Sequence, residues 1–133
     1  MHTFSWPIRV YYEDTDAGGV VYYANYLKFF ERARTEMLRS IGFEQDVLRA
    51  ELNILFVVHA VQLEYLKPAK FNELLQVDTE IIELKKTRLV FRQLISKEGT
   101  PLCRAQVSIA CVNETTMRPT AIPATLIEQL NNE

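Results

Sequence analysis

Only one stretch of this chain carries a long helical pattern, and it limits how the rest of the chain can pack. Between Tyr22 and Ile41, apolar residues return at steps of three and four, while charged residues fill much of the remaining surface. Gly42 follows, and glycine tolerates the left-handed conformation that commonly ends a helix. The pattern predicts one long amphipathic helix over residues 22–41, with a single apolar stripe to bury. A weaker helical pattern covers residues 44–50.

The other regular segments alternate apolar and polar residues, as strands do. The first strand contains Pro7, which lacks the amide hydrogen that an inner strand needs, so we expect it at a sheet edge. No helical pattern separates the later strands, so they should pair antiparallel. The sequence therefore predicts a single α+β domain spanning residues 1–133. Its predicted strands and its short closing helix cover residues 5–12, 56–65, 75–82, 88–96, 103–111 and 124–130.

Charge and cysteine content exclude several classes of protein. The net charge is −2 over 133 residues, which argues against the basic face that sequence-independent nucleic-acid binding needs. No apolar run reaches the roughly 18 residues of a membrane span, and no signal peptide precedes the first strand. Cys103 and Cys111 fall on one predicted strand, too far apart to bridge within a chain, so buried thiols of a cytoplasmic protein are expected. No Cys and His spacing indicates a metal site.

Candidate chemistry concentrates between the first strand and the long helix. There the chain brings Asp14 and Asp16 to a turn that contains Gly18 and Gly19. Glycines allow a substrate to approach the backbone, and the first amides of a helix lack internal partners and favour negative charge. This arrangement suits a carbonyl oxygen that becomes an oxyanion, beside a carboxylate that attacks or activates water. The alternative is that both aspartates only cap the turn and the helix.

Six segments of the chain together form a longer motif. They are residues 9–16, 18–22, 25–26, 30–36, 64–69 and 118–123, with the sequences RVYYEDTD, GGVVY, NY, FERARTE, EYLKPA and RPTAIP. Across these segments, and over nearly its whole length, the chain resembles the 4-hydroxybenzoyl-CoA thioesterase family. It resembles more closely the YbgC-like branch that is associated with the bacterial Tol–Pal genes.

The resemblance implies a hotdog fold, which is a curved five-stranded antiparallel sheet wrapped around one long central helix. It also implies a homodimer, formed by extending the sheet across two subunits, or a dimer of dimers. Members of the family hydrolyse acyl-CoA thioesters without a metal or an organic cofactor. The expected partner is thus an acyl-CoA substrate or an acyl carrier protein.

The resemblance also assigns roles to individual residues. Asp16 matches the catalytic aspartate, as nucleophile or general base, and the backbone amide of Tyr23 matches the group that polarises the thioester carbonyl. Asp14, with Gly18 and Gly19, matches the residues that support the loop. Many YbgC-like sequences have a histidine where this chain has Tyr23, but the backbone amide carries the role, so the assignment holds.

A basic hairpin and two other functions complete the expectations. Lys85, Lys86 and Arg88 match the position where the family binds the phosphates of coenzyme A; the alternative is a solvated turn. A non-catalytic module that binds acyl-CoA or acyl carrier protein, linked to envelope assembly, is the competing function. A hydratase on the same fold is less favoured, because such enzymes usually need a histidine beside the acid and residues 13–27 contain none.

Overall fold

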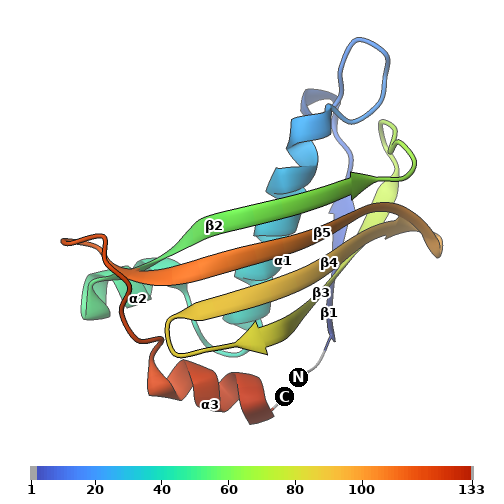
Figure 1. Ribbon diagram of the computed structural model, residues 1–133. Coiled ribbons are helices and arrows are strands. Elements are labelled where there is room, and N and C mark those ends of the chain that lie inside the picture. Colours follow the sequence, from blue (N-terminus) through green and yellow to red (C-terminus); the bar gives the residue numbers. More distant parts are fainter. Residues whose placement is uncertain (1–2, 133) are drawn as a thin grey trace.

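A computed structural model describes residues 3–132 as a curved antiparallel sheet with three α-helices and two 3-10 turns (Figure 1). This confirms the predicted α+β class and the hotdog-type arrangement of a sheet around a long helix. The strands are β1 (Thr3–Arg9), β2 (Ile54–Tyr65), β3 (Leu74–Leu84), β4 (Arg88–Lys97) and β5 (Thr100–Asn113). The helices are α1 (Tyr26–Ser40), α2 (Gln45–Leu52) and α3 (Ala124–Asn132), and the turns are η1 (Tyr12–Asp14) and η2 (Tyr23–Asn25).

The strand order β1-β3-β4-β5-β2 places β1 and β2 at the two edges of the sheet. Pro7 lies on edge strand β1 opposite Gln76, which confirms the edge position expected for a proline-containing strand. Each neighbouring pair is antiparallel. Irregular registers at Val58/Ala60, Ile81/Glu83 and Ile95/Ser96 mark the kind of local bulge that increases the bend of a strand. The sheet therefore curves over α1.

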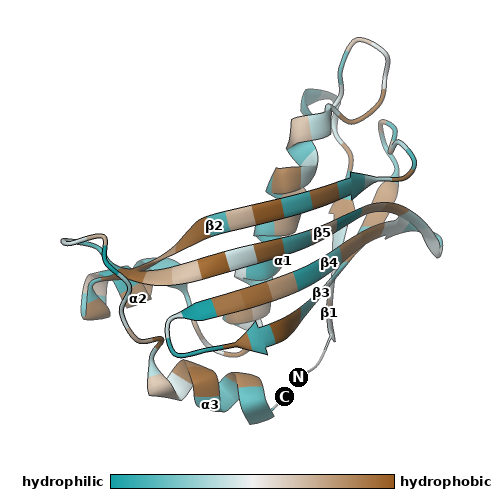
Figure 2. Cartoon of the chain, in the orientation of Figure 1, coloured by the Kyte–Doolittle hydropathy of each residue, from teal (hydrophilic) through white to brown (hydrophobic). Residues whose placement is uncertain are grey.

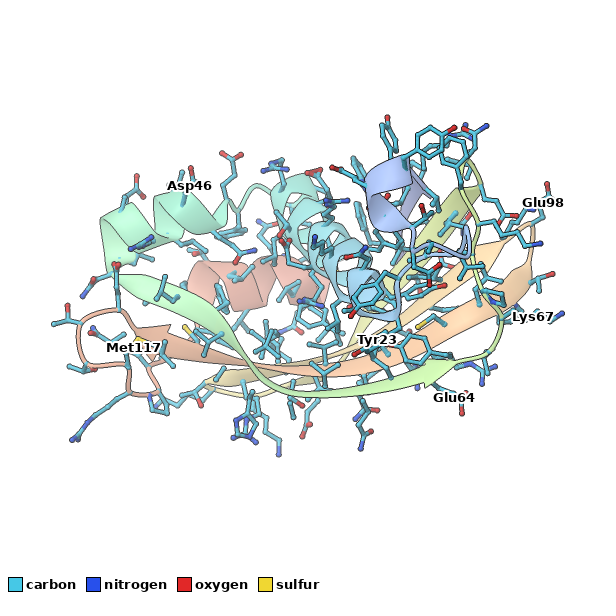
Figure 3. All side chains as sticks on the ribbon, turned by 90° about the horizontal axis from the view of Figure 1, so that it is seen from above. Tyr23, Asp46, Glu64, Lys67, Glu98 and Met117 are labelled. Carbon is cyan, nitrogen blue, oxygen red and sulfur yellow. The ribbon has the colours of Figure 1, made fainter. Side chains whose placement is uncertain are left out.

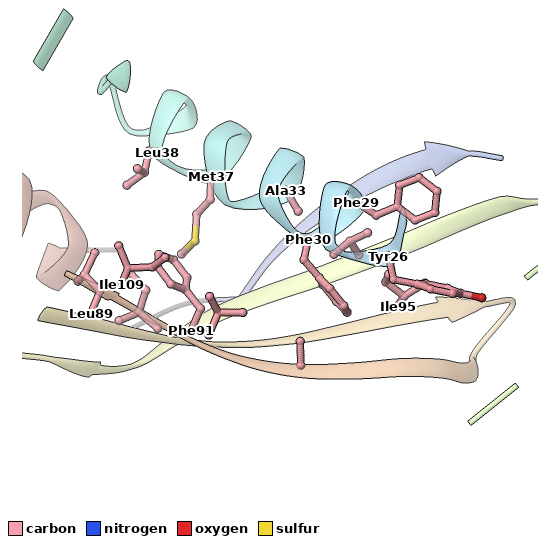
Figure 4. Close-up of a cluster of buried hydrophobic side chains, with 14 of the residues drawn as sticks. Tyr26, Phe29, Phe30, Ala33, Met37, Leu38, Leu89, Phe91, Ile95 and Ile109 are labelled. Carbon is pink, nitrogen blue, oxygen red and sulfur yellow. The ribbon is translucent and has the colours of Figure 1, made fainter. Parts of the chain in front are cut away.

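The core lies between α1 and the face of the sheet that the helix covers. The apolar stripe of α1 is almost fully buried and packs against side chains of the inner strands (Figure 4). Apolar and polar residues alternate along β2 to β5, so one face of each strand joins this core (Figure 2). Burying each large apolar side chain stabilises the fold by about 1.5–3 kcal/mol. The principal members of the cluster are Phe29, Phe30, Ala33, Met37, Leu89, Phe91, Ile95 and Ile109.

Beside the candidate site, two predicted boundaries were wrong. The first strand ends at Arg9 instead of Tyr12, because Tyr12 enters η1 and stacks on Phe71, with 3.8 Å between ring centroids. The long helix begins at Tyr26 instead of Tyr22, because the preceding residues form the separate turn η2. Its predicted end is confirmed, since Gly42 follows α1 with φ +92°.

The two cysteines lie on β5, where both are buried and unpaired, as the sequence predicted. Burial raises the pKa of the Cys103 thiol to about 12. Within residues 3–132, no helix has the length and hydrophobicity needed to cross a membrane.

Candidate active site

The loop that follows η1 is a small hairpin fastened to the segment before β3. Thr15 pairs with Val21, the Asp16 N–H donates to Val20 O (2.9 Å), and the Gly19 N–H returns to Asp16 O (3.0 Å). Gly19 has φ +80°, a conformation that favours glycine. The Val21 N–H donates to Ala69 O at 2.8 Å. These backbone bonds hold the loop in one conformation.

Asp16 stands exposed on this loop. Its Oδ1 accepts a 2.8 Å hydrogen bond from the Gly18 N–H. A Cβ atom at position 18 would lie 3.3 Å from the same oxygen, so glycine leaves the carboxylate its space. Among residues 3–132, no donor reaches Asp16 Oδ2. One oxygen of Asp16 is therefore oriented and the other is available.

Asp14 lies two residues earlier but in a different environment, with only 5% of its surface exposed. Its Oδ2 accepts the Tyr11 N–H at 2.8 Å. Its backbone oxygen accepts both the Tyr22 N–H and the side-chain amide of Asn25, each at 2.9 Å. Asp14 therefore joins η1 to the start of the helical segment, and the residue is almost fully shielded from solvent.

The peptide between Tyr22 and Tyr23 has one end anchored and the other available. Its oxygen accepts the Asn25 N–H at 2.8 Å, whereas its N–H, that of Tyr23, donates no backbone hydrogen bond within the described range. The following peptide is held as well, because the oxygen of Tyr23 accepts a hydrogen bond from the Tyr65 hydroxyl at 2.9 Å. An amide whose carbonyl end is hydrogen-bonded is a stronger donor through polarisation. The Tyr23 N–H can therefore polarise an incoming oxygen.

Tyr23 lines a hollow of about 320 Å³ between the start of α1 and the end of β2. Figure 3 shows Tyr23 above the last part of β2, on the side of the sheet that carries α1. Burial is the main cause that raises the pKa of both Tyr26 and Tyr65, so the two phenols stay protonated. The Tyr65 hydroxyl donates to Tyr23 O, and the Tyr26 hydroxyl oxygen accepts the Ala69 N–H at 3.0 Å. Asp16 is not among the residues that line this hollow. Those residues are Val21, Tyr23, Tyr26, Tyr65, Leu66, Lys67 and Pro68.

The predicted phosphate-binding hairpin connects β3 to β4. The Lys85 N–H donates to Arg88 O at 2.8 Å, and Lys85 Nζ lies 2.8 Å from Glu83 Oε1. The backbone oxygen of Lys86 accepts the Ile122 N–H at 2.8 Å, which ties the hairpin to the segment before α3. The Lys85 side chain is thus already engaged with a carboxylate.

Within one chain the hairpin and the Asp16 loop lie at opposite ends of the sheet (Figure 1). The loop is bonded to Ala69, just before β3, and the hairpin follows the last residue of that strand. The 11 residues of β3 span about 35 Å at about 3.3 Å each. The structure therefore brings Asp14, Asp16 and Tyr23 into one region and does not bring Lys85, Lys86 or Arg88 to it.

Sequence reasoning missed Tyr65 as a site residue. In the sequence, only its place inside the EYLKPA segment indicated a role for Tyr65. A tyrosine at the end of a strand does not by itself indicate a functional residue. Only the fold shows that its hydroxyl reaches Tyr23, 42 residues away. Within the described part of the chain, no group of three His, Cys, Asp or Glu side chains is placed to hold a metal ion.

Comparison with known proteins gives a consistent result. A family model described as thioesterase-like superfamily matches residues 10–130. The chain is 48% identical over 127 residues to the acyl-CoA thioester hydrolase YbgC of Escherichia coli O6:H1, covering 95% of this chain and 94% of that protein. It is 49% identical over 120 residues to the acyl-CoA thioesterase YbgC of Haemophilus influenzae, covering 90% and 88%.

A solved structure agrees with these sequence matches. The crystal structure of a probable thioesterase from Bartonella henselae has a TM-score of 0.88 to this chain at 37% identity, covering 92% of this chain and 100% of the other. By sequence and by structure, the chain belongs to the thioesterase-like superfamily and to its YbgC-like branch.

Proposed function

We propose that this chain hydrolyses the thioester bond of acyl-coenzyme A to a free acid and coenzyme A. The observation that carries the proposal is the Tyr23 N–H, which has no backbone acceptor among residues 3–132 and belongs to a residue lining a hollow next to the Asp16 loop. Relatives that are almost half identical over 95% of the chain bear the name acyl-CoA thioester hydrolase, which supports the same activity.

In the proposed reaction the Tyr23 N–H binds the thioester carbonyl oxygen and stabilises the negative charge that develops on it. Asp16 acts on the carbonyl carbon through the oxygen that accepts no hydrogen bond. As a nucleophile it forms a C–O bond while the C–S bond breaks and the thiolate of coenzyme A leaves; water then hydrolyses the mixed anhydride. As a general base it takes a proton from a water molecule whose oxygen forms the new C–O bond; the C–S bond then breaks and the thiolate of coenzyme A leaves.

Asp14, Gly18 and Gly19 have supporting roles in this proposal. Asp14 connects the two turns through its backbone oxygen, and Gly18 leaves room for the Asp16 carboxylate. Gly19 takes the positive φ that closes the hairpin. None of the three needs to touch the substrate.

We further propose a homodimer, or a dimer of dimers, in which β2 of one subunit pairs antiparallel with β2 of another. Within residues 3–132, β2 is an edge strand that exposes 53% of Val58 and 38% of Val61. Arg88 and Val57 both pair with Ala110, so the basic hairpin lies at the end of the sheet where β2 begins. Antiparallel pairing would bring the partner's hairpin toward the Tyr23 hollow, where its lysines can meet the phosphates of coenzyme A.

The activity is tested by release of free thiol from a panel of aliphatic and aromatic acyl-CoAs. Asp16→Asn should lower kcat/KM by about 10³-fold, within the range for loss of a positioned acid or base. Asp46→Asn is the matched control, because Asp46 is an exposed aspartate on α2 at the other end of the molecule (Figure 3). Undiminished turnover by Asp16→Asn, or no turnover of any substrate by the unmodified chain, would refute the proposal.

Removing the hairpin charges with Lys85→Ala and Lys86→Ala should raise KM while kcat changes little, because the phosphates lie far from the reacting carbonyl. Sedimentation at decreasing concentration, with activity followed in parallel, tests the dimer. A chain that stays fully active as a single subunit would contradict a site completed by a partner.

One observation favours a second function, that of a non-catalytic module for acyl-CoA or acyl carrier protein linked to envelope assembly. Asp16 is exposed and does not line the Tyr23 hollow. Calorimetry distinguishes the two functions: tight binding of an acyl-CoA that the chain leaves intact over hours would favour the binding module.

A further inference from the structure

A second, smaller pocket lies farther along the same seam between α1 and β2. Its volume is about 110 Å³, and its polar side is formed by Glu31, Arg34, Thr35 and Gln45. Its apolar wall combines one residue of α1 with side chains from three strands: Leu38, Phe56, Val58, Leu89, Phe91 and Ile109. We call it the Arg34 pocket.

Arg34 is held at the base of this pocket by a buried glutamine. Its Nη1 donates to Gln93 Oε1 at 3.0 Å. Gln93, only 1% exposed, donates in turn to Phe30 O at 3.0 Å and to Thr79 Oγ1 at 2.9 Å. The position of the Arg34 side chain is therefore set by three elements, α1, β3 and β4.

Most hydrogen-bonding capacity of Arg34 is unused. A guanidinium carries five N–H donors, and one side-chain hydrogen bond engages it among residues 3–132. The same residues place no carboxylate at salt-bridge distance from it. Glu31, one turn earlier on α1, instead accepts the Thr35 hydroxyl at 2.7 Å. Arg34 therefore keeps donors for an acceptor that enters the pocket.

Partial burial of this cation is unfavourable without an anion beside it. Desolvation lowers the pKa of Arg34, and the carboxylate of Glu31 only partly opposes that shift. Arginine side chains are seldom buried unless they are paired. The guanidinium also presents a planar fork that matches a carboxylate. An arriving carboxylate would supply the missing counter-charge.

The Arg34 pocket is in reach of the proposed reaction centre. Tyr26 lines the hollow at the start of α1, and Arg34 lies eight residues later on the same helix, about 12 Å along its axis at about 1.5 Å per residue. Tyr65, the last residue of β2, borders the hollow, and Val58, seven residues earlier on the same strand, borders the Arg34 pocket. The two sites therefore lie in line along α1, in the direction that an acyl chain would take from a carbonyl held at Tyr23.

The size of the pocket bears on the end of that chain. A dry cavity of about 150 Å³ holds a benzene ring, so about 110 Å³ fits the end of an unbranched chain better than a ring. Resting on the proposed function, we propose that the Arg34 pocket receives the far end of the acyl chain and that Arg34 selects acyl groups ending in a carboxylate. Arg34 is then a specificity-determining residue for thioesters of dicarboxylic acids.

The test compares acyl-CoAs of equal length that differ only at the far end, with chains long enough to cover the distance of about 12 Å to Arg34: sebacoyl with decanoyl, and dodecanedioyl with dodecanoyl. Arg34→Met should lower kcat/KM for the carboxylate-ended member by about tenfold or more, the usual weight of a charged hydrogen bond. The methyl-ended member should change by less than about threefold, since Met fills the same apolar space. Arg34→Lys keeps the charge but not the fork and should fall between the two.

Arg32→Met is the matched control, because Arg32 is an exposed arginine on the same helix, and it should leave both substrates unchanged. Equal losses on both members of a pair, or no loss on either, would overturn the role of Arg34. Thermal melting of each variant separates a change in selectivity from a failure to fold. If Arg34→Met does not fold, the test relies on Arg34→Lys alone, through its ratio of kcat/KM for the carboxylate-ended and methyl-ended members of each pair.

Failure of the proposed function is read separately with thioether analogues of the same pairs, which cannot be hydrolysed. Calorimetry should find that the carboxylate-ended analogue binds the unmodified chain about tenfold more tightly than the methyl-ended one, and that Arg34→Met removes the difference. If that difference in affinity is found while no thioester is hydrolysed, the proposed role of the Arg34 pocket is supported and the proposed hydrolysis is refuted. Equal binding of both analogues overturns the pocket.

Discussion

The stability of this fold should depend strongly on Gln93, a polar side chain inside the core. Gln93→Leu keeps nearly the same volume but removes three hydrogen bonds, to Arg34, Phe30 O and the Thr79 hydroxyl. Thr79 is fully buried, so its hydroxyl loses a donor with no water to replace it. With about 1–3 kcal/mol for each buried group left unsatisfied, we expect a loss of about 3–5 kcal/mol. That is a large part of an ordinary domain's stability of about 5–15 kcal/mol.

Urea unfolding at a fixed protein concentration measures this loss, because an associating chain changes stability with concentration. Gln106→Leu is the control, since Gln106 is exposed on β5, and it should stay within about 0.5 kcal/mol of the unmodified chain. The double variant Thr79→Val/Gln93→Leu removes both ends of one hydrogen bond. It should cost less than the sum of the two single variants by about 1 kcal/mol.

A loss of less than about 1 kcal/mol in the free energy of unfolding of Gln93→Leu would refute the reasoning, because the loss of three hydrogen bonds to buried partners should cost more than that. Strict additivity of the Thr79 and Gln93 variants would refute the specific contact between them.

Three further predictions follow from other contacts. Tyr65→Phe removes the hydroxyl that holds Tyr23 O and should lower kcat about threefold to tenfold with little change in KM, as measured by steady-state kinetics. Burial opposes the charge of Glu73, but the hydrogen bonds from Lys97 Nζ and from the Lys70 N–H, with the positive charges of both lysines, together outweigh that effect and lower the pKa of Glu73. The stabilisation from this carboxylate is therefore present above pH 4.5 and is lost as the pH falls through the lowered pKa of the folded state. Glu73→Gln should lower the free energy of unfolding at pH 7 and leave it unchanged at strongly acidic pH. Urea unfolding at the two pH values measures the difference. Cys103, buried with a pKa of about 12, should react with a thiol reagent at pH 8 only as fast as the chain opens, and labelling as fast as that of a free thiol would contradict its burial.

Element types and edge positions could be predicted from the sequence because local patterns decide them. Periodicity located α1 and the strands, and Pro7 indicated an edge. The boundaries beside the site could not be predicted in the same way. Tyr22 fits the helical stripe, yet its N–H is bonded to Asp14 O and the chain turns there before the helix begins. Such a bond between two loops has no periodicity.

The candidate site was predictable in part for a similar reason. Asp14, Asp16 and Tyr23 lie close together along the chain, so one motif contains them. The Tyr65 hydroxyl donates to the backbone oxygen of Tyr23, 42 positions away in the sequence. The side-chain oxygen of Gln93 accepts a hydrogen bond from Arg34, 59 positions away. Only the folded sheet brings those partners together. Gln93 left one trace, as a polar residue at an inward position of β4.

The open edge of β2 also bears on the fate of a newly folded chain. Its 12 residues carry no proline and one charged side chain, Glu64, and their alignment with β5 shifts at His59. An edge of this kind is a template for any extended peptide, and proteins usually guard it. Newly made chains at high concentration are therefore expected to aggregate through this edge unless β2 pairs first with β2 of a second copy. Placing a lysine at Ala60 would give the edge the protection it lacks and make the isolated chain easier to handle.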